Sequence, residues 1–156
     1  GWETSLHPPY DVLVASDVLE HLKDPWAFLR RARRWISPDG VLVAAVPNTL
    51  QWRARAKLLR GLWRYEDWGV FDRGHLRFFT PATARGMLEE TGFTVLKEVL
   101  SPDVPFLNGG VHRAVSRDPD APAGLWEKTS QSIAGRWPGL FTTHLILVAR
   151  PVEGRP

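Results

Sequence analysis

Two apolar runs joined by an amphipathic segment constrain the fold of this chain more than any other feature. The first run lies in a predicted strand over residues 11–16, and the second covers residues 41–46; both read as strands buried on both faces. Between them, Asp24-Pro25 supplies a helix N-cap and a first helical residue, and apolar side chains recur at helical spacing until residues 37–40, Ser-Pro-Asp-Gly, turn the chain. This order predicts a βαβ unit with parallel strands.

The remaining chain continues the alternation of helices and strands. In order, we expect a helix over 50–64, an aromatic loop over 65–79, a helix over 80–91, a strand over 93–100, an irregular connection over 101–124, a weakly indicated helix over 125–137 and a last strand over 142–149. Lys97 and Glu98 indicate that strand 93–100 has an exposed edge. The sequence therefore predicts one α/β domain.

Composition narrows the class of protein. At 156 residues, the chain has the length of one domain. It contains no cysteine, which excludes disulfides, thiolate catalysis and cysteine-ligated metals, and which fits a cytosolic protein. No apolar run approaches the length of a membrane span, and no signal peptide opens the sequence. We therefore expect a cytoplasmic protein.

Polar residues gather where the first predicted strand ends. Ser16, Asp17, Glu20 and His21 follow the apolar run, and ligands of open parallel sheets bind beyond the carboxyl ends of the strands. If the chain turns helical after Ser16, the spacing places Asp17, Glu20 and His21 on one face. Two carboxylates and an imidazole can bind a divalent cation or deprotonate a hydroxyl group. His75, in the later part of the aromatic loop, is a candidate for the same place.

Several motifs in this order resemble one enzyme family. The segments YDVLVASDVLEHL, DPWAFLRRARRWISPDGVLVAAVPN, DRGHLRFFT and EETGF are similar to the C-terminal half of class I S-adenosylmethionine-dependent methyltransferases, in the small-molecule and ubiquinone-type branch. The resemblance runs from Tyr10 to Phe93, and more loosely to the last strand. It implies a Rossmann-like α/β sheet of about four strands with flanking helices, in which 11–16, 41–46, 93–100 and 142–149 correspond to strands four to seven. The last of these is expected to run antiparallel.

The resemblance also implies a division of the chain. Residues 1–150 would form a partial methyltransferase domain, residues 50–79 a substrate lid within it, and residues 151–156 a tail. The family's glycine-rich loop and the acidic residue that binds the ribose have no counterpart here, so we expect a fragment of a longer protein rather than a degenerate homologue. We therefore expect weak S-adenosylmethionine binding by this chain alone. We also expect self-association through an exposed strand 11–16.

Roles for individual residues follow from the resemblance. Ser16 and Asp17 would contact the methionine part of S-adenosylmethionine, and His21 and His75 would activate the acceptor. Trp52, Arg53, Tyr65 and Trp68 would contact the substrate. In a purely structural alternative, Asp17 lines the cofactor pocket, Glu20 and His21 brace the turn after the strand through local hydrogen bonds, and His75 is their structural partner.

A metal site is the remaining alternative for the polar cluster. The set Asp17, Glu20, His21 and His75 resembles the metal site of methyltransferases that modify the terminal 2′-hydroxyl of small RNAs. It is also similar to the Glu-x-x-Glu-His cluster of ubiquinone-biosynthesis O-methyltransferases. Asp17 takes the place of the first glutamate there and has a shorter side chain. We therefore expect no metal.

The helix over 50–64 carries a basic stripe, Arg53, Lys57, Arg60 and Arg64, beside an apolar one. The stripe is either a solvated face or part of a lid that binds an anionic acceptor through arginines. Alternatively, Trp52, Leu59 and Trp63 contact a membrane surface and give access to a lipid-linked acceptor, which makes the protein peripheral to the membrane. A second arginine run, Arg30–Arg34, lies on a helix that is expected to pack against the sheet, and no nucleic-acid motif accompanies it, so we do not expect nucleic acid as a partner.

The function predicted for the intact protein is S-adenosylmethionine-dependent methylation of an oxygen on a small-molecule or lipid- or glycan-type acceptor. The alternative is a catalytically inactive, methyltransferase-like half-domain that serves as a binding or dimerisation module. A dehydrogenase-like nucleotide binder shares the fold class, but the segment YDVLVASDVLEHL does not belong to it.

Overall fold

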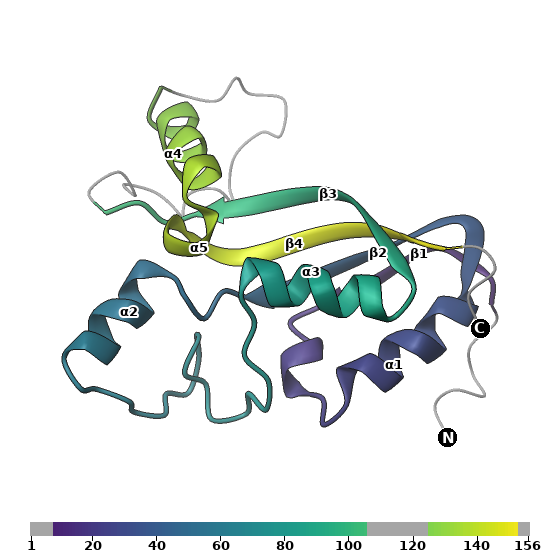
Figure 1. Ribbon diagram of the computed structural model, residues 1–156, viewed down its shortest axis with the longest axis horizontal. Coiled ribbons are helices and arrows are strands. Elements are labelled where there is room, and N and C mark those ends of the chain that lie inside the picture. Colours follow the sequence, from purple (N-terminus) through teal and green to yellow (C-terminus); the bar gives the residue numbers. More distant parts are fainter. Residues whose placement is uncertain (1–7, 106–124, 153–156) are drawn as a thin grey trace.

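A mixed four-stranded sheet forms the centre of the protein in a computed structural model, which describes residues 8–105 and 125–152 (Figure 1). The strands are β1 (Tyr10–Ser16), β2 (Ile36–Pro47), β3 (Phe93–Pro102) and β4 (Thr142–Pro151), in the spatial order β1-β2-β4-β3. β1 is parallel to β2, and β4 is antiparallel to both β2 and β3. The predicted α/β sheet with an antiparallel last strand is therefore confirmed.

Helices connect the strands. They are α1 (Pro25–Ala32), α2 (Trp52–Leu59), α3 (Pro81–Glu90), α4 (Leu125–Arg136) and α5 (Pro138–Phe141), with short 3-10 turns η2 (Leu19–His21) and η3 (Arg33–Trp35). The Asp24 carboxylate caps α1 by accepting from the Ala27 N–H at 2.8 Å. A reciprocal capping box between Thr80 and Thr83 starts α3, and Gly92 follows that helix with a φ of 85°. Side-chain capping of this kind satisfies the free N–H groups of the first turn.

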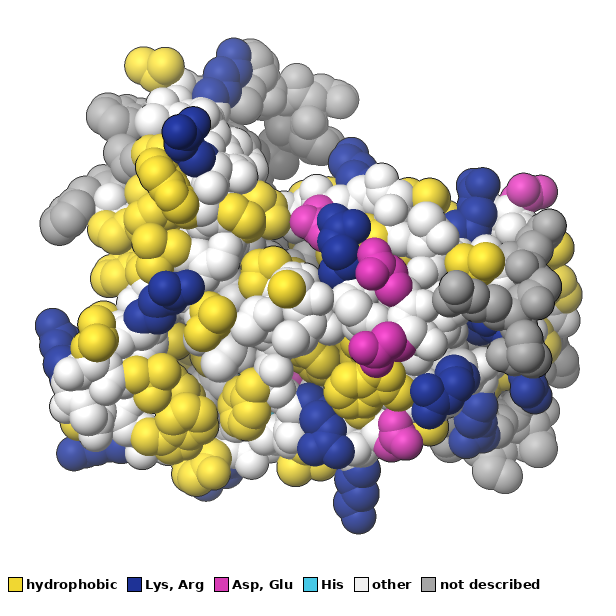
Figure 2. All heavy atoms as spheres, in the orientation of Figure 1, with side chains coloured by type: hydrophobic (Ala, Val, Ile, Leu, Met, Phe, Trp, Pro, Cys, Tyr) yellow, Lys and Arg dark blue, Asp and Glu magenta, His cyan; other side chains and the backbone are white. Residues whose placement is uncertain are grey.

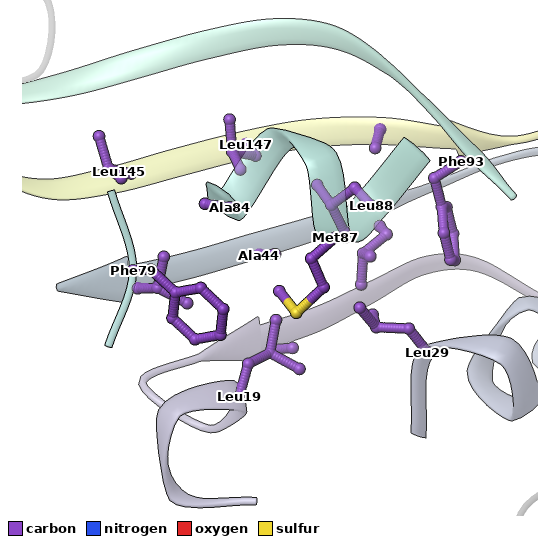
Figure 3. Close-up of a cluster of buried hydrophobic side chains, with 14 of the residues drawn as sticks. Leu19, Leu29, Ala44, Phe79, Ala84, Met87, Leu88, Phe93, Leu145 and Leu147 are labelled. Atoms are coloured by element: carbon purple, nitrogen blue, oxygen red, sulfur yellow. The ribbon is translucent and has the colours of Figure 1, made fainter. Parts of the chain in front are cut away.

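The hydrophobic core lies between the sheet and the two helices α1 and α3, which pack against the same face (Figure 3). Its fully buried members include side chains from both helices and from the strands: Leu29, Leu42, Met87, Leu88 and Phe93. Leu19, in η2, is also fully buried in this core. The packing of Leu19 therefore fixes the turn that carries the polar residues Glu20 and His21.

The prediction that strand 11–16 is buried on both faces is wrong. Leu13 and Ala15 of β1 face the core, whereas Val12 and Val14 are 55% and 66% exposed. The reason is that α1 and α3 cover one face of the sheet, and β1 pairs on one side only, at the sheet edge. The apolar run therefore forms an edge strand with one apolar face open.

Residues 37–40 belong to β2 rather than to a separate turn before it. The pairing of β1 with β2 shifts between Tyr10↔Ile36 and Val12↔Val41, so the Ser-Pro-Asp-Gly segment is a bulge. Ser37 Oγ donates to Asp11 Oδ1 at 3.0 Å across this bulge. A Cβ at Gly40 would lie 2.9 Å from the Asp11 carbonyl oxygen, which explains the glycine. Residues that are typical of a turn therefore form a bulge inside a strand here.

Two predicted helices end earlier than expected. The helix predicted up to Ile36 ends at Ala32 and continues as η3, and the helix predicted over 50–64 is confined to α2. Gly61 adopts a φ of 68° just beyond α2, where a helix cannot continue. The domain division into 1–150 and a tail stays a prediction, and most of the predicted connection 101–124 lies outside the described residues. Within the described ranges, no helix has the length and hydrophobicity of a membrane span.

Candidate active site

The polar cluster predicted from the sequence lies at the carboxyl ends of β1 and β2. Directly after β1, Asp17 adopts a φ of 51°, a left-handed conformation that is uncommon for residues other than glycine. Its N–H donates to the Ala45 carbonyl of β2 at 3.0 Å, which holds the strained turn in place. This turn leads the chain into η2, so that Glu20 and His21 lie beyond the carboxyl ends of β1 and β2.

Glu20 is fully buried, and neither of its carboxylate oxygens has a hydrogen-bond partner in the described part of the chain. Its backbone carbonyl accepts from the N–H groups of Leu76 at 2.8 Å and Arg77 at 3.0 Å. Burial is the main cause that raises the pKa of the Glu20 carboxyl, and the charge of Asp17 adds to the rise; the backbone N–H of Glu20 itself, and then His75 and His21, act in the opposite direction. Unpartnered buried carboxylates are rare in proteins, which marks this one as a functional candidate.

Two imidazoles next to Glu20 are oriented by backbone carbonyls. His21 Nδ1 lies 2.9 Å from the Gly74 carbonyl oxygen, and His75 Nδ1 lies 3.2 Å from that of Val70. A carbonyl oxygen can only accept, so each Nδ1 carries a proton and each neutral ring keeps its lone pair on Nε2. The two rings meet edge to face, with 4.8 Å between their centroids.

Glu20, His21 and His75 each offer one ligand atom, and these atoms lie within 4.8 Å of one another. They line one side of a pocket of about 210 Å³. Its lining residues are Asp17, Glu20, His21, Pro47, Trp68, Gly69, Asp72, His75 and His144. Three carboxylates and three imidazoles thus converge on one small space.

Four predicted site residues, Asp17, His21, Trp68 and His75, are brought together in this pocket. Ser16, Trp52, Arg53 and Tyr65 are not among its lining residues. Ser16 Oγ donates to Asp17 Oδ2 at 3.0 Å, so Ser16 contacts a residue that lines the pocket. The predicted roles of all eight residues stay predictions.

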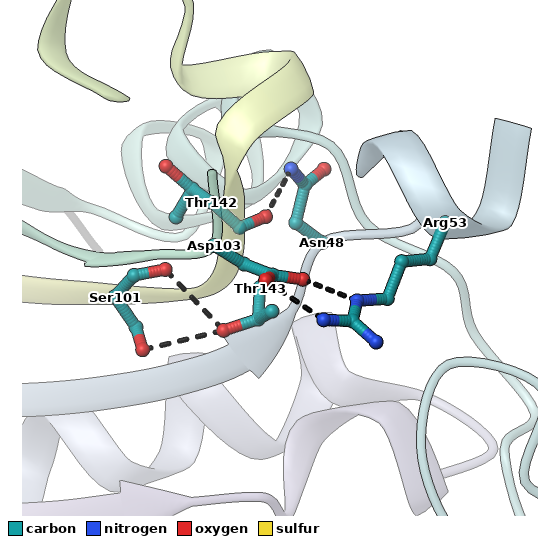
Figure 4. Close-up of polar contacts among 6 residues, drawn as sticks. All are labelled: Asn48, Arg53, Ser101, Asp103, Thr142 and Thr143. Carbon is teal, nitrogen blue, oxygen red and sulfur yellow. Dashed lines mark hydrogen bonds and ion pairs between the residues drawn. The ribbon is translucent and has the colours of Figure 1, made fainter. Parts of the chain in front are cut away.

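Arg53 is held by an acid away from the pocket (Figure 4). Its Nε and Nη2 donate to the carboxylate of Asp103 at 2.7 Å and 3.1 Å, and this carboxylate raises the pKa of Arg53. Beside it, the buried Asn48 donates from Nδ2 to the Thr142 carbonyl at 2.8 Å. The Arg53 contact fastens segment 50–79 to the residue after β3, and the Asn48 contact joins the end of β2 to the start of β4.

His144 is a pocket residue that sequence reasoning missed. It stands near the start of β4 and pairs with Pro47, and its Nε2 lies 3.4 Å from Asp17 Oδ1. Because β4 is antiparallel, its first residues lie at the same edge as the carboxyl ends of β1 and β2. An antiparallel last strand was predicted, so a polar residue at its start could have been identified from that topology.

Comparison with known proteins identifies the family of this chain. A model of the methyltransferase domain family matches residues 2–98. A ubiquinone biosynthesis O-methyltransferase from Methylobacterium nodulans is 34% identical over 90 residues, which covers 56% of this chain and 35% of that protein. Its counterpart from a Caulobacter species is 39% identical over 51 residues, 32% of this chain and 20% of that protein. The chain thus spans about a third or less of the length of these curated relatives.

Solved structures agree on the fold. A SAM-dependent methyltransferase from Archaeoglobus fulgidus aligns with a TM-score of 0.56 at 19% identity, over 96% of this chain and 63% of that one. A SAM-dependent methyltransferase from Thermotoga maritima aligns with the same TM-score at 15% identity, over 92% of this chain and 56% of that one. The open sheet is therefore a Rossmann-like methyltransferase sheet.

Proposed function

This chain belongs to the methyltransferase domain family, and we propose that the protein transfers the methyl group of S-adenosylmethionine to an oxygen of a small-molecule or lipid- or glycan-type acceptor. One observation supports an oxygen acceptor above all. Among the described residues, the Glu20 side chain is buried without a hydrogen-bond partner, close to two histidines whose lone pairs are on Nε2. A hydroxyl group that enters the pocket has one proton to donate, and it could give this proton either to the Glu20 carboxylate, which lacks a partner, or to the Nε2 of an imidazole.

The acidic lining of this pocket suits the reacting, positively charged end of S-adenosylmethionine. Three acidic side chains, Asp17, Glu20 and Asp72, line the space, and they would favour the positive charges of a sulfonium and an amino group. Ser16 and Asp17 would hold the methionine part. The pocket measures about 210 Å³, below the roughly 300–1,000 Å³ of complete small-molecule sites. For this reason we expect weak cofactor binding by the chain alone.

The residues of the chain contribute position and proton transfer. When bound, S-adenosylmethionine supplies a methyl group on a cationic sulfur, open to in-line attack by an oxygen. His75 or His21 would accept the hydroxyl proton at Nε2, because each Nδ1 proton is held by a backbone carbonyl. Glu20 would stabilise the imidazolium that then forms, and Trp68 at the pocket wall would limit the entry of water.

A divalent cation bound by Glu20, His21 and His75 is the second candidate. The observation that favours it is the same cluster, whose three ligand atoms lie within 4.8 Å of one another. In metal sites, ligating histidines commonly donate the other ring N–H to a carbonyl oxygen, as both rings do here. A bound cation would lower the pKa of the acceptor hydroxyl instead of requiring a base.

The test compares Glu20→Gln and His75→Gln with Glu89→Gln, an exposed glutamate on α3, as matched control. The readout is S-adenosylhomocysteine formed from a panel of phenols, catechols and alcohols. We expect kcat to fall by about 10²–10⁴ in the two pocket variants, the usual contribution of a positioned acid or base, and to stay unchanged in the control. Circular dichroism verifies that each variant is folded.

Two outcomes separate the alternatives. If activity is lost in EDTA and restored by Mg²⁺ or Mn²⁺, the cation replaces the acid–base assignment. If the protein, at the full length that its gene encodes, forms no S-adenosylhomocysteine with any acceptor and binds no S-adenosylmethionine by calorimetry, the inactive binding or dimerisation module is the correct interpretation.

A further inference from the structure

Exposed apolar side chains are concentrated in the segment between β2 and α3. Of the sixteen large hydrophobic residues that are exposed in the described part of the chain, nine lie within residues 50–78. The densest group is a tip at residues 58–65, in which every residue is exposed. It includes Leu59 at 89% exposure and Tyr65 at 66%. Figure 2 shows these apolar side chains gathered at the lower left, over α2 and the loop that follows it.

The same segment carries the positive charge of the molecule. Residues 50–78 contain seven Lys and Arg against three Asp and Glu, whereas the whole chain has 20 against 17. The rest of the chain therefore has one more acid than base. Within the segment, Lys57 pairs with Glu66 and Arg73 with Asp67. In the part that the structure describes, Arg60 and Arg64 of the tip form no ion pair.

The tip projects from a packed base. Ala54, Val70 and Phe71 form a small buried cluster of their own, and Trp63 packs against Phe71 with 4.9 Å between ring centroids. At the start of the tip, the Gly61 N–H donates to the Leu58 carbonyl at 2.9 Å and the Leu62 N–H donates to that of Lys57 at 3.0 Å, so backbone hydrogen bonds close the end of α2. These bonds and the packing of Trp63 on Phe71 give the tip a defined base, from which its leucines face the solvent.

We propose that the 58–65 tip docks on an anionic lipid surface, with its leucines and aromatic rings in the interface and Arg60 and Arg64 at the phosphates. Apolar side chains interleaved with unpaired arginines match the two attractions that hold peripheral proteins on membranes. Tryptophan and tyrosine favour the headgroup level, and arginines extend their charge to it. A single-stranded nucleic acid would use the arginines and rings but gain little from exposed leucines.

The tip is continuous with the candidate active site. Trp68 lies three residues beyond the tip, is 81% exposed and also lines the pocket with Glu20 and His75. An acceptor with an apolar tail could therefore stay in the lipid phase while its hydroxyl group enters the pocket. This delivery step rests on the proposed function, whereas the docking of the tip does not.

Vesicle flotation tests the docking without cofactor or acceptor. We expect the protein to float with phosphatidylcholine–phosphatidylglycerol vesicles, to remain unbound with phosphatidylcholine alone and to dissociate as salt is raised. Leu59→Ser with Leu62→Ser, and separately Arg60→Glu with Arg64→Glu, should each weaken binding about tenfold or more. The matched controls are Leu125→Ser and Arg30→Glu, exposed positions on α4 and α1, and they should bind as the unchanged protein does.

Three results would overturn the proposal: equal flotation with neutral vesicles, unchanged binding in the leucine pair, or equal loss in the controls. Binding to heparin that depends on the arginines but not on the leucines would identify a soluble polyanion site instead. Unchanged melting temperatures exclude unfolding as the cause. Since flotation needs no methyl transfer, failure of the proposed function would leave this result intact, and the reverse also holds.

Discussion

At the scale of the residue, Glu20 is the most unusual side chain of the protein. It is fully buried, its carboxylate has no partner among the described residues, and burial raises its pKa. A carboxylate in such a place destabilises the fold when it is charged. This loss of stability is explained if a hydroxyl group or a cation binds to Glu20 during function.

The pH dependence of stability tests this view of Glu20. Its folded-state pKa lies above the ordinary 4.5, so its contribution to stability is full below pH 4.5 and is lost as the pH rises through the raised value. Glu20→Gln should therefore be more stable than the unchanged protein at neutral pH, by about 1–3 kcal/mol, and the difference should shrink towards pH 4. Urea unfolding in EDTA across this range measures it. A variant that is less stable at pH 7 would contradict the prediction, and Glu89→Gln is the control.

At the scale of the element, α2 is held in place by an ion pair with Asp103, the residue that follows β3. Arg53 of α2 forms a bidentate pair with Asp103, whose side chain is only 4% exposed, while the arginine is 58% exposed. The pair joins segment 50–79 to the end of β3, fifty residues later. Arg53 therefore has a structural task whether or not it also contacts a substrate.

Replacement of Arg53 separates these two tasks. Arg53→Ala should lower the free energy of unfolding by about 1–2 kcal/mol, because the buried Asp103 carboxylate loses its charged hydrogen-bond partner. The loss is no larger because solvent screens the exposed arginine. It should also speed proteolysis within residues 50–79. Arg60→Ala, which changes an exposed tip arginine, serves as control and should do neither. If Arg53→Ala raises KM for the acceptor without a change in stability, the arginine is a substrate contact.

At the scale of the whole molecule, the sheet is covered unequally. The helices α1 and α3 pack on one face of the sheet. β1 lies at an edge of the sheet, and its Val12 and Val14 are exposed on the opposite face. An apolar edge strand is a template for pairing with another chain. We infer that β1 dominates the association behaviour of the chain as given.

Light scattering after size exclusion tests this inference. We expect the chain to form dimers or larger species at micromolar concentration, and Val14→Lys to shift it towards the monomer, because a charge on the exposed face opposes strand pairing. Val18→Lys, just outside β1 and also exposed, is the matched control. A monomer in the unchanged chain, or equal effects of the two lysines, would refute the role of β1.

Local chemistry along the sequence determined several elements of this protein. The apolar runs, the Asp24-Pro25 cap and the Thr80-Pro81 start define elements through contacts only a few residues apart, so β1, α1, β2 and α3 could be predicted. The motifs around Asp17 to His21 likewise indicated the family and the edge of the sheet that carries the site. These signals are readable because they depend on neighbours in the sequence.

The tertiary structure decided what depends on distant residues. The burial of Glu20, the open face of β1 and the pairing of Arg53 with Asp103 are set by segments that approach only after folding. His144 enters the pocket because an antiparallel strand brings it to the carboxyl ends of β1 and β2. The sequence thus determined the type of sheet and the residues at its edge. Only the packing of remote segments decided which of them share one pocket, because burial and orientation are properties of the whole fold.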